Sequence, residues 1–436
     1  MGVEPHQSPV QKKALVPFQR AYRFVLLFMV IYFARPEDWI PGVHYLHLAK
    51  IAGIVAIVVF LSELGSARTK WPRECLYLFL LLGQMLLTVP FSPVWRGGAL
   101  RVTRDFASVV PMILVIALAV NTLPRLRRIL MWQVSAVAVI AVIAVFKYRH
   151  AAGRLEGVLN GNYANPNDFA LTVVIALPIC LAFMLRAKSN LVKFGWLGCI
   201  GIMTYAVVLT ASRGGILAFA LAMGVSLWHF SIKGRYRYLL VILSGFALLA
   251  LLVGGHELRQ RYEAMSSAQV GQSAHGSAEQ REALLKKSIE ATFRYPIFGL
   301  GPGNFNTYSG NWHVTHNTYT QMSSETGIPG FILYMMILWC AWKNLRQAKR
   351  LARRESELAL FTGAIHASLM GFLVGSFFGS EGYAYFTYFL IAYTTAIYQI
   401  AKRKETVLTV TGQKALVPDF HSQHAENACS AFSNVL

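Results

Sequence analysis

The run DFALTVVIALPICLAFML at residues 168–185 decides the fold, because it is apolar almost throughout and contains one charged residue. A helix needs about 20 mostly apolar residues to cross the core of a bilayer. Comparable runs recur on both sides of this one, nearly to the end of the chain. Together they predict about twelve membrane-spanning helices, at residues 21–36, 46–62, 74–91, 104–121, 127–146, 168–185, 194–211, 214–232, 238–254, 328–343, 358–379 and 383–401. We therefore expect an all-α polytopic membrane protein.

The composition agrees with this class. Of the 436 residues, 55% are hydrophobic and only 14% are charged, whereas a soluble domain carries about 25% charged residues. The formal net charge is +21, but the lysines and arginines lie mainly in short connectors between apolar runs. That distribution is typical of orientation charges and contacts with anionic lipids. Membrane lipid is therefore an expected partner, and nucleic acid is not.

The connector charges predict the topology, because lysine and arginine favour the cytoplasmic side. Both termini are then cytoplasmic, and one long connector lies outside. The expected parts are a tail at 1–20, a membrane domain of about nine helices at 21–254, a large periplasmic loop at 255–327, a membrane domain of about three helices at 328–401 and a tail at 402–436.

The large loop has three recognisable parts. Residues 266–280 are small and polar, so we expect them to be mobile. Residues 281–294 have an amphipathic helical pattern, with Leu284, Leu285, Ile289 and Phe293 as its apolar positions, and Pro296 ends it. A glycine-rich turn then occupies residues 296–305.

Arg101 and Arg104, with Asp105, lie at the start of an expected span. A charge in the bilayer costs about 2.5–3.5 kcal/mol on translocon scales, so its presence needs a reason. One interpretation is a helix-end anchor with an internal ion pair. The other is that the arginines hold an anionic substrate, and the sequence leaves both open.

The stretch RLEGVLNGNYANPND at 154–168 leads into the next span, and Arg154, Asn165, Asn167 and Asp168 are candidate substrate-binding residues. Asn167 or Asp168 is the expected N-cap of that helix. Because free backbone N–H groups at a helix start also attract anions, capping and substrate binding are both open interpretations.

The segment ASRGG at 211–215 places Ser212 and Arg213 in a tight turn between two spans. Arginine presents a planar fork that matches phosphate oxygens, and the glycines would let a large ligand approach the backbone. We favour phosphate binding by Arg213 over a structural salt bridge.

The large loop contributes the remaining candidates: Arg281, His313, His316, Asn317, Tyr319 and Glu325. The spacing of His313 and His316 could hold a metal on a helix, but no HExxH or carboxylate cluster accompanies them. We expect neither a metal nor a cofactor. From residue type alone, His316 is either a structural histidine or a proton acceptor.

Missing motifs narrow the chemistry further. The sequence has no Walker A lysine motif, and it has no GxSxG or HExxH within a span. An enzyme facing outward without ATP must use a substrate that carries its own activation. A sugar linked to a polyprenyl diphosphate is such a substrate, because its leaving group is already activated.

Four motifs in this order resemble the O-antigen ligase and O-antigen polymerase superfamily of bacterial membrane proteins. They are GNYANPNDFA (161–170), ASRGG (211–215), the arginine-led helix from Arg281 to the turn of Pro296, Gly299 and Gly301, and HNTYTQMSSETGIPG (316–330). The resemblance covers about residues 150–380.

The resemblance implies a fold of the membrane-embedded glycosyltransferase C type in the bacterial inner membrane. It also implies transfer of a glycan from undecaprenyl diphosphate to an acceptor hydroxyl. In ligases the acceptor is the lipid A-core oligosaccharide, and in polymerases it is another lipid-linked repeat unit. By position, Arg213 and Arg281 would bind the diphosphate, His316 would be catalytic, and Asn317, Tyr319 and Glu325 would shape the pocket.

We therefore expect a metal-independent, inverting glycosyltransferase of the ligase type that acts by one direct displacement. A polymerase remains the alternative within the enzyme class. A transporter or flippase for lipid-linked glycans also needs many helices and arginines, but it does not need His316, and we see no inverted repeat. A structural or assembly protein would leave the polar motifs unexplained.

Overall fold

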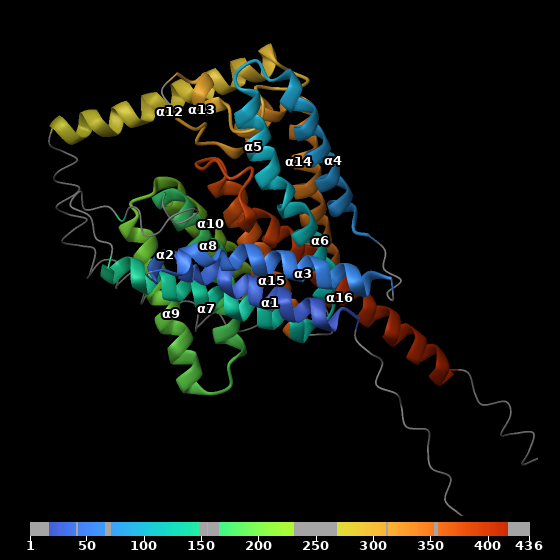
Figure 1. Cartoon of the computed structure of the whole chain (residues 1–436). Helices are drawn as coiled ribbons and strands as arrows, with labels where there is room; N and C mark the ends of the chain where they lie inside the picture. The colour runs from blue at the N-terminus through green and yellow to red at the C-terminus, as the bar shows by residue number, and fades with distance from the viewer. Residues whose placement is uncertain are drawn as a thin grey trace, which may run out of the picture.

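The computed structural model describes residues 17–40, 42–65, 71–147, 155, 165–230, 268–310, 313–352 and 356–416. Within these ranges every regular element is a helix, as the apolar runs predict (Figure 1). In chain order the helices are α1 (Gln19–Ala34), α2 (Pro36–Trp39), η1 (Val43–Leu46), α3 (Leu48–Leu64), α4 (Arg73–Phe91), α5 (Arg96–Ala107), α6 (Val109–Ala119), α7 (Leu123–Lys147), α8 (Pro166–Arg186), α9 (Asn190–Leu209), α10 (Arg213–Phe230), α12 (Ala268–Arg294), α13 (Phe305–Tyr308), α14 (Thr318–Leu351), α15 (Ser356–Gly375) and α16 (Tyr385–Leu416).

The described helices confirm an all-α polytopic membrane protein. Within the described ranges, 9 helical segments are long and apolar enough to cross a membrane. The first expected span coincides with α1, which has only 16 residues, and the last coincides with α16, which is rich in tyrosine and threonine. Neither is among the 9. The expected span at 238–254 lies outside the described residues, so the total of about twelve stays a prediction.

The burial of the helices separates the centre of the bundle from its periphery. In α8, 89% of the apolar window is buried, whereas the corresponding share is 22% for the segment containing α3 and 28% for α9. Exposed large apolar side chains such as Ile54 and Val58 of α3 therefore face outward, as the lipid-facing side chains of a membrane protein do. The run that decides the fold forms the buried centre, and its first turn reaches the site described below.

Helix α12 lies across one end of the bundle, where α4, α5 and α14 also end (Figure 1). We call this the α12 end of the molecule. We expected residues 266–280 to be mobile, and the structure adds that their backbone is helical from Ala268. Helix α16 also continues to Leu416, past the expected boundary at 401.

The expected apolar face of α12 was only partly right. Leu284 is buried, but Ile289 is 42% and Phe293 is 75% exposed. The face that packs against the protein instead combines Leu284 with the small residues Ser288 and Ala291, which are both fully buried. Small side chains let α12 approach its neighbours closely. The contact face therefore lies about one residue position away from the face that apolar periodicity alone predicts.

Candidate active site

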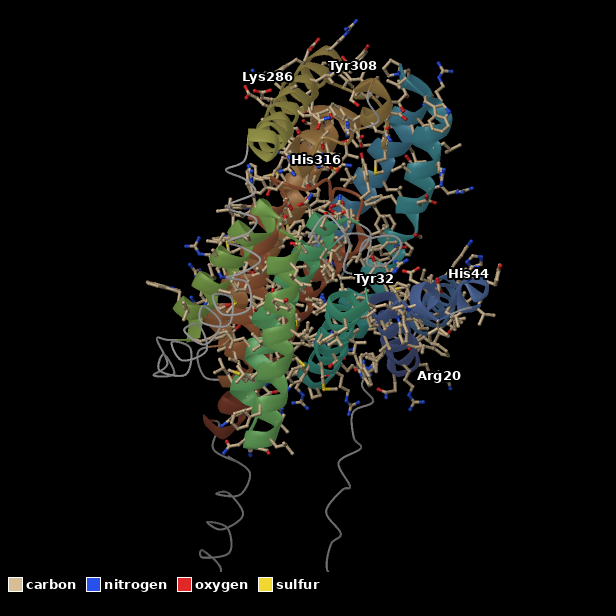
Figure 2. The ribbon with its side chains drawn as sticks, turned by 90° about the vertical axis from the view of Figure 1, so that its left-hand side faces the viewer. Arg20, Tyr32, His44, Lys286, Tyr308 and His316 are labelled. Atoms are coloured by element: carbon tan, nitrogen blue, oxygen red, sulfur yellow. The ribbon has the colours of Figure 1, made fainter. Side chains whose placement is uncertain are left out.

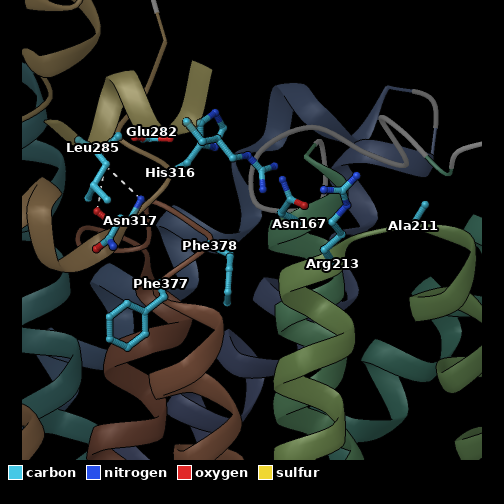
Figure 3. Close-up of a pocket in the computed structure, with 11 residues that line it drawn as sticks. Asn167, Ala211, Arg213, Glu282, Leu285, His316, Asn317, Phe377 and Phe378 are labelled. Carbon is cyan, nitrogen blue, oxygen red and sulfur yellow. Dashed lines mark hydrogen bonds between the residues drawn. The ribbon is translucent and has the colours of Figure 1, made fainter. Parts of the chain in front are cut away.

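A cavity of about 490 Å³ opens at the α12 end of the molecule and joins residues that are far apart in the sequence. Figure 2 shows His316 beneath the helix that carries Lys286, toward the opposite end from Arg20. The lining residues come from the start of α8, the turn before α10, α12, the segment before α14 and the turn after α15 (Figure 3). They are Asn167, Ala211, Arg213, Arg281, Glu282, Leu285, Thr315, His316, Asn317, Phe377 and Phe378.

Arg213 reaches the cavity because the turn between α9 and α10 is held firmly. Ala211 has a left-handed backbone with φ 49°. The Ser212 hydroxyl donates a 2.7 Å hydrogen bond to Asn167 Oδ1 and accepts one of 3.1 Å from the Gly215 backbone N–H. Ser212 is 2% exposed and does not line the cavity, so this predicted substrate-binding residue positions Asn167 and the start of α10.

The glycines of ASRGG have a packing role. A Cβ atom on Gly214 would lie 2.3 Å from Phe378 Cβ, and one on Gly215 would lie 2.8 Å from Ala170 Cβ. We expected these glycines to leave room for a ligand. Instead they let α10 pack closely against α8 and the turn after α15.

The start of α8 is capped by Asn165, two residues earlier than expected. Its side chain accepts a 2.8 Å hydrogen bond from the Asn167 backbone N–H, and Pro166 occupies the first turn. Asn165 is therefore a cap, while Asn167 lines the cavity. Asp168 does not line the cavity but lies beside Glu381. Burial and the neighbouring Asp168 carboxylate raise the pKa of Glu381 well above its usual value.

His316 and Arg281 form the electrostatic centre of the cavity. Burial lowers the pKa of the Arg281 guanidinium, and the nearby charge of Arg213 lowers it further. Burial, Arg281 and His313, in that order, lower the pKa of His316 to about 4. His316 is therefore neutral near pH 7, and its imidazole can accept a proton.

The segment before α14 fixes the position of His316, whose backbone is left-handed with φ 52°. The Asn317 side chain caps α14 by accepting hydrogen bonds from the backbone N–H groups of Tyr319 (2.9 Å) and Thr320 (3.2 Å). Thr318 ties this segment to the turn after α15, because its backbone N–H donates to Ser376 O at 2.8 Å and its hydroxyl donates to Gly379 O at 2.9 Å.

A crossing of two backbone segments joins α12 to α14, and we call it the clasp (296–301 with 324–328). Three backbone hydrogen bonds hold it: Leu300 N–H to Ser324 O (2.8 Å), Gly301 N–H to Glu325 O (3.0 Å) and Ile328 N–H to Pro296 O (2.7 Å). Gly327 interrupts α14 with φ 71°, and a Cβ atom there would lie 2.3 Å from Ile297 O. Only glycine fits this crossing without strain.

Glu325 and Tyr319 support the cavity without lining it. The buried Glu325 carboxylate accepts hydrogen bonds from the backbone N–H groups of Gly303 (2.9 Å) and Phe305 (3.0 Å), so it holds the glycine-rich turn beside the clasp. The Tyr319 hydroxyl donates to Leu373 O at 2.8 Å. Both were predicted to shape the pocket. In the structure their side chains hydrogen-bond to backbone groups of the segments around the cavity and do not line it.

The other predicted residues lie elsewhere. Arg101 and Arg104 are exposed on α5 and do not line the cavity, and Arg154 lies outside the described residues. Within the described residues, no group of at least 3 His, Cys, Asp or Glu side chains is placed to hold a metal ion.

Sequence reasoning missed Phe377 and Phe378. Their only signal was an aromatic pair between Gly375 and Gly379 at the end of an expected span. A phenylalanine at the end of an apolar run is indistinguishable, by sequence, from one that faces lipid.

Comparison with known proteins identifies the segment that holds most of these residues. A family model described as O-antigen ligase matches residues 197–335. The match covers Arg213, Arg281 and His316, while Asn167 and Phe377 lie outside it. No curated protein matches the chain. This match, in a chain whose described helices include membrane spans, supports the O-antigen ligase superfamily.

Proposed function

We propose that this protein transfers a glycan from undecaprenyl diphosphate to an acceptor hydroxyl of the lipid A-core oligosaccharide or a related glycan. The superfamily indicates glycan transfer of the ligase or polymerase kind in general. The donor, the ligase activity and a site on the outer face of the bacterial inner membrane are part of the proposal. The observation that carries it is one cavity that joins Arg213 and Arg281 to a neutral histidine.

The paired arginines favour a ligand with several negative charges. Arg213 and Arg281 come from different helices, and the charge of Arg213 adds to burial in lowering the pKa of Arg281. Glu282 also lines the cavity, but its carboxylate pairs with Lys286 at 2.7 Å. Two guanidinium groups held together gain most from a diphosphate, whose oxygens can accept hydrogen bonds from both forks.

The reaction would be a direct displacement at the anomeric carbon of the donor sugar. The acceptor oxygen forms the new glycosidic bond as the bond from carbon to the diphosphate oxygen breaks, which inverts the anomeric configuration. His316 takes the acceptor's hydroxyl proton, and the diphosphate leaves with the bonding electron pair. Arg213 and Arg281 stabilise the negative charge that develops on it, so the mechanism needs no metal ion.

The test uses purified protein in nanodiscs with a lipid-linked oligosaccharide donor and a panel of acceptors. We expect glycan transfer by the wild type and its loss in Arg213→Gln, Arg281→Gln and His316→Gln. Arg294→Gln is the matched control, because Arg294 lies on the exposed part of α12 away from the cavity.

Each outcome assigns a function. Transfer to core oligosaccharide supports a ligase, and transfer only to a second lipid-linked unit identifies a polymerase. If neither the wild type nor any variant transfers glycan and lipid translocation is observed instead, the protein is a flippase and not an enzyme. Full transfer by His316→Gln would remove the base from the mechanism.

A further inference from the structure

The cavity has two chemically different sides. Figure 3 shows Asn167 and Arg213 on one side of His316 and Phe377, Asn317 and Leu285 on the other. The first side carries cationic and amide groups. The second offers an aromatic ring, an aliphatic side chain, one amide and the carboxylate of Glu282, which pairs with Lys286. The proposed function uses the first side and His316, and it leaves the second side without a role.

Phe377 is an open aromatic surface with a firm support. Its side chain is 54% exposed although it lines the cavity. Its ring lies 4.6 Å from the Tyr319 ring, with an interplanar angle of 46°. Tyr319 is anchored at both ends, because its hydroxyl donates to Leu373 O (2.8 Å) and its backbone N–H donates to Asn317 Oδ1 (2.9 Å). The ring therefore presents a fixed apolar face to the cavity that His316 also lines.

A polar group accompanies this ring. Asn317 uses its Oδ1 atom to cap α14, and within the described residues its Nδ2 atom donates no hydrogen bond. An aromatic face beside a free amide donor suits a pyranose, which has an apolar face of C–H groups and an equatorial rim of hydroxyls. A lipid chain would match the ring but not the amide.

The geometry of the displacement decides which sugar binds there. The attacking oxygen must approach the anomeric carbon from the side opposite the leaving diphosphate. If Arg213 and Arg281 hold the diphosphate, the acceptor lies on the far side of His316, where Phe377 and Asn317 are. This step rests on the proposed function.

We propose that Phe377 and Asn317 form the acceptor subsite, with a pyranose ring of the acceptor stacked on Phe377 and one of its hydroxyls bound to Asn317 Nδ2. The subsite places the acceptor hydroxyl at His316. It makes Phe377 a determinant of acceptor affinity, and the donor does not contact it.

The test compares Phe377→Ala, Phe377→Leu and Phe377→Trp with the wild type, and Phe293→Ala is the control because Phe293 is a 75% exposed aromatic on α12. In the transfer assay we expect the acceptor KM to rise about tenfold in the alanine and leucine variants. It should return to near the wild-type value with tryptophan, and the donor KM should not change. An unchanged acceptor KM in Phe377→Ala, or full rescue by leucine, would overturn the subsite.

A second measurement separates this inference from the function on which it rests. Deacylated core oligosaccharide is titrated into the same nanodiscs without donor, and binding is followed by saturation-transfer NMR. Wild type and Phe377→Trp should bind, and Phe377→Ala should bind about tenfold more weakly. If no form transfers glycan but this pattern of binding appears, the subsite stands and the proposed reaction fails. If Phe377→Ala binds the oligosaccharide as the wild type does, the subsite is wrong whatever the activity.

Discussion

The titration of His316 tests the electrostatics of the cavity directly. Burial, the Arg281 charge and His313 lower the pKa of His316 to about 4. A lowered pKa means that the neutral imidazole is favoured, so His316 should stay a proton acceptor from neutral pH down to about pH 5. If His316 is the base, kcat/KM for transfer should keep its value over this range and fall only as the pH approaches 4, because kcat/KM reports the free enzyme.

Replacing Arg281 by glutamine removes one of the causes and should raise the pKa of His316. Burial is the first cause and remains in the variant, so the pKa should still lie below 6.5. We expect a rise of about one pH unit, which corresponds to about 1.4 kcal/mol of lost repulsion. Arg281→Lys keeps a positive charge at this position and is the matched control, with a smaller rise expected.

The assay is an NMR titration of histidine labelled with ¹³C and ¹⁵N in nanodisc-embedded protein. The sequence has 12 histidines, and the resonance that disappears in His316→Gln identifies the one of interest. Arg281→Gln will have lost transfer activity under the proposed mechanism, so the resonance and not the rate is the readout. A wild-type His316 that titrates near pH 6.5 would refute the prediction that burial and nearby positive charges lower its pKa. A midpoint unchanged by Arg281→Gln would refute the contribution of Arg281.

Two further predictions concern the clasp and the metal-free mechanism. Gly327→Ala should destabilise the protein by about 1–3 kcal/mol, because a Cβ atom would meet Ile297 O at 2.3 Å at a φ of 71°. Its thermal unfolding midpoint should fall, whereas Gly224→Ala, with nothing within 4 Å of the added Cβ atom, should unfold as the wild type does. Under the proposed mechanism glycan transfer should survive EDTA, since Arg213 and Arg281 would take the place of a metal at the diphosphate. Complete loss of transfer that only a divalent ion restores would contradict that mechanism.

The apolar runs predicted the helices well because a membrane imposes a simple condition on sequence. A chain that crosses lipid must satisfy its backbone within a helix and present an apolar surface of fixed length. Every expected span within the described residues accordingly falls on helix, although the span at 104–121 is divided between α5 and α6. Helix α12 is not an expected membrane span, so this condition does not apply to it. Its contact face depends on the close approach that Ser288 and Ala291 allow.

The site was predictable residue by residue but not as an arrangement. Arg213 and His316 were recognisable from their chemistry and their motifs, and both line the cavity. Glu325 belongs to the same motif as His316, yet its carboxylate binds backbone N–H groups of the glycine-rich turn. A polar motif does not distinguish a side chain that meets a ligand from one that supports the chain around it. Phe377 lines the cavity from the turn after α15, which Thr318 binds at Ser376 and Gly379.

The clasp explains why supporting residues matter for the chemistry. Arg281 lies 13 residues before the end of α12 at Arg294, which is about 20 Å of helix. His316 immediately precedes Asn317, the N-cap of α14, which is the other helix that the clasp joins. A tilt of about 5° at the clasp would therefore move Arg281 by about 2 Å relative to His316, and a misplacement of about 1 Å can cost about 100-fold in rate. Gly327 lets the two backbones touch, and Glu325 holds the turn beside them. Under the proposed mechanism these residues help to set the distance between Arg281, which would bind the diphosphate, and His316, which would take the proton.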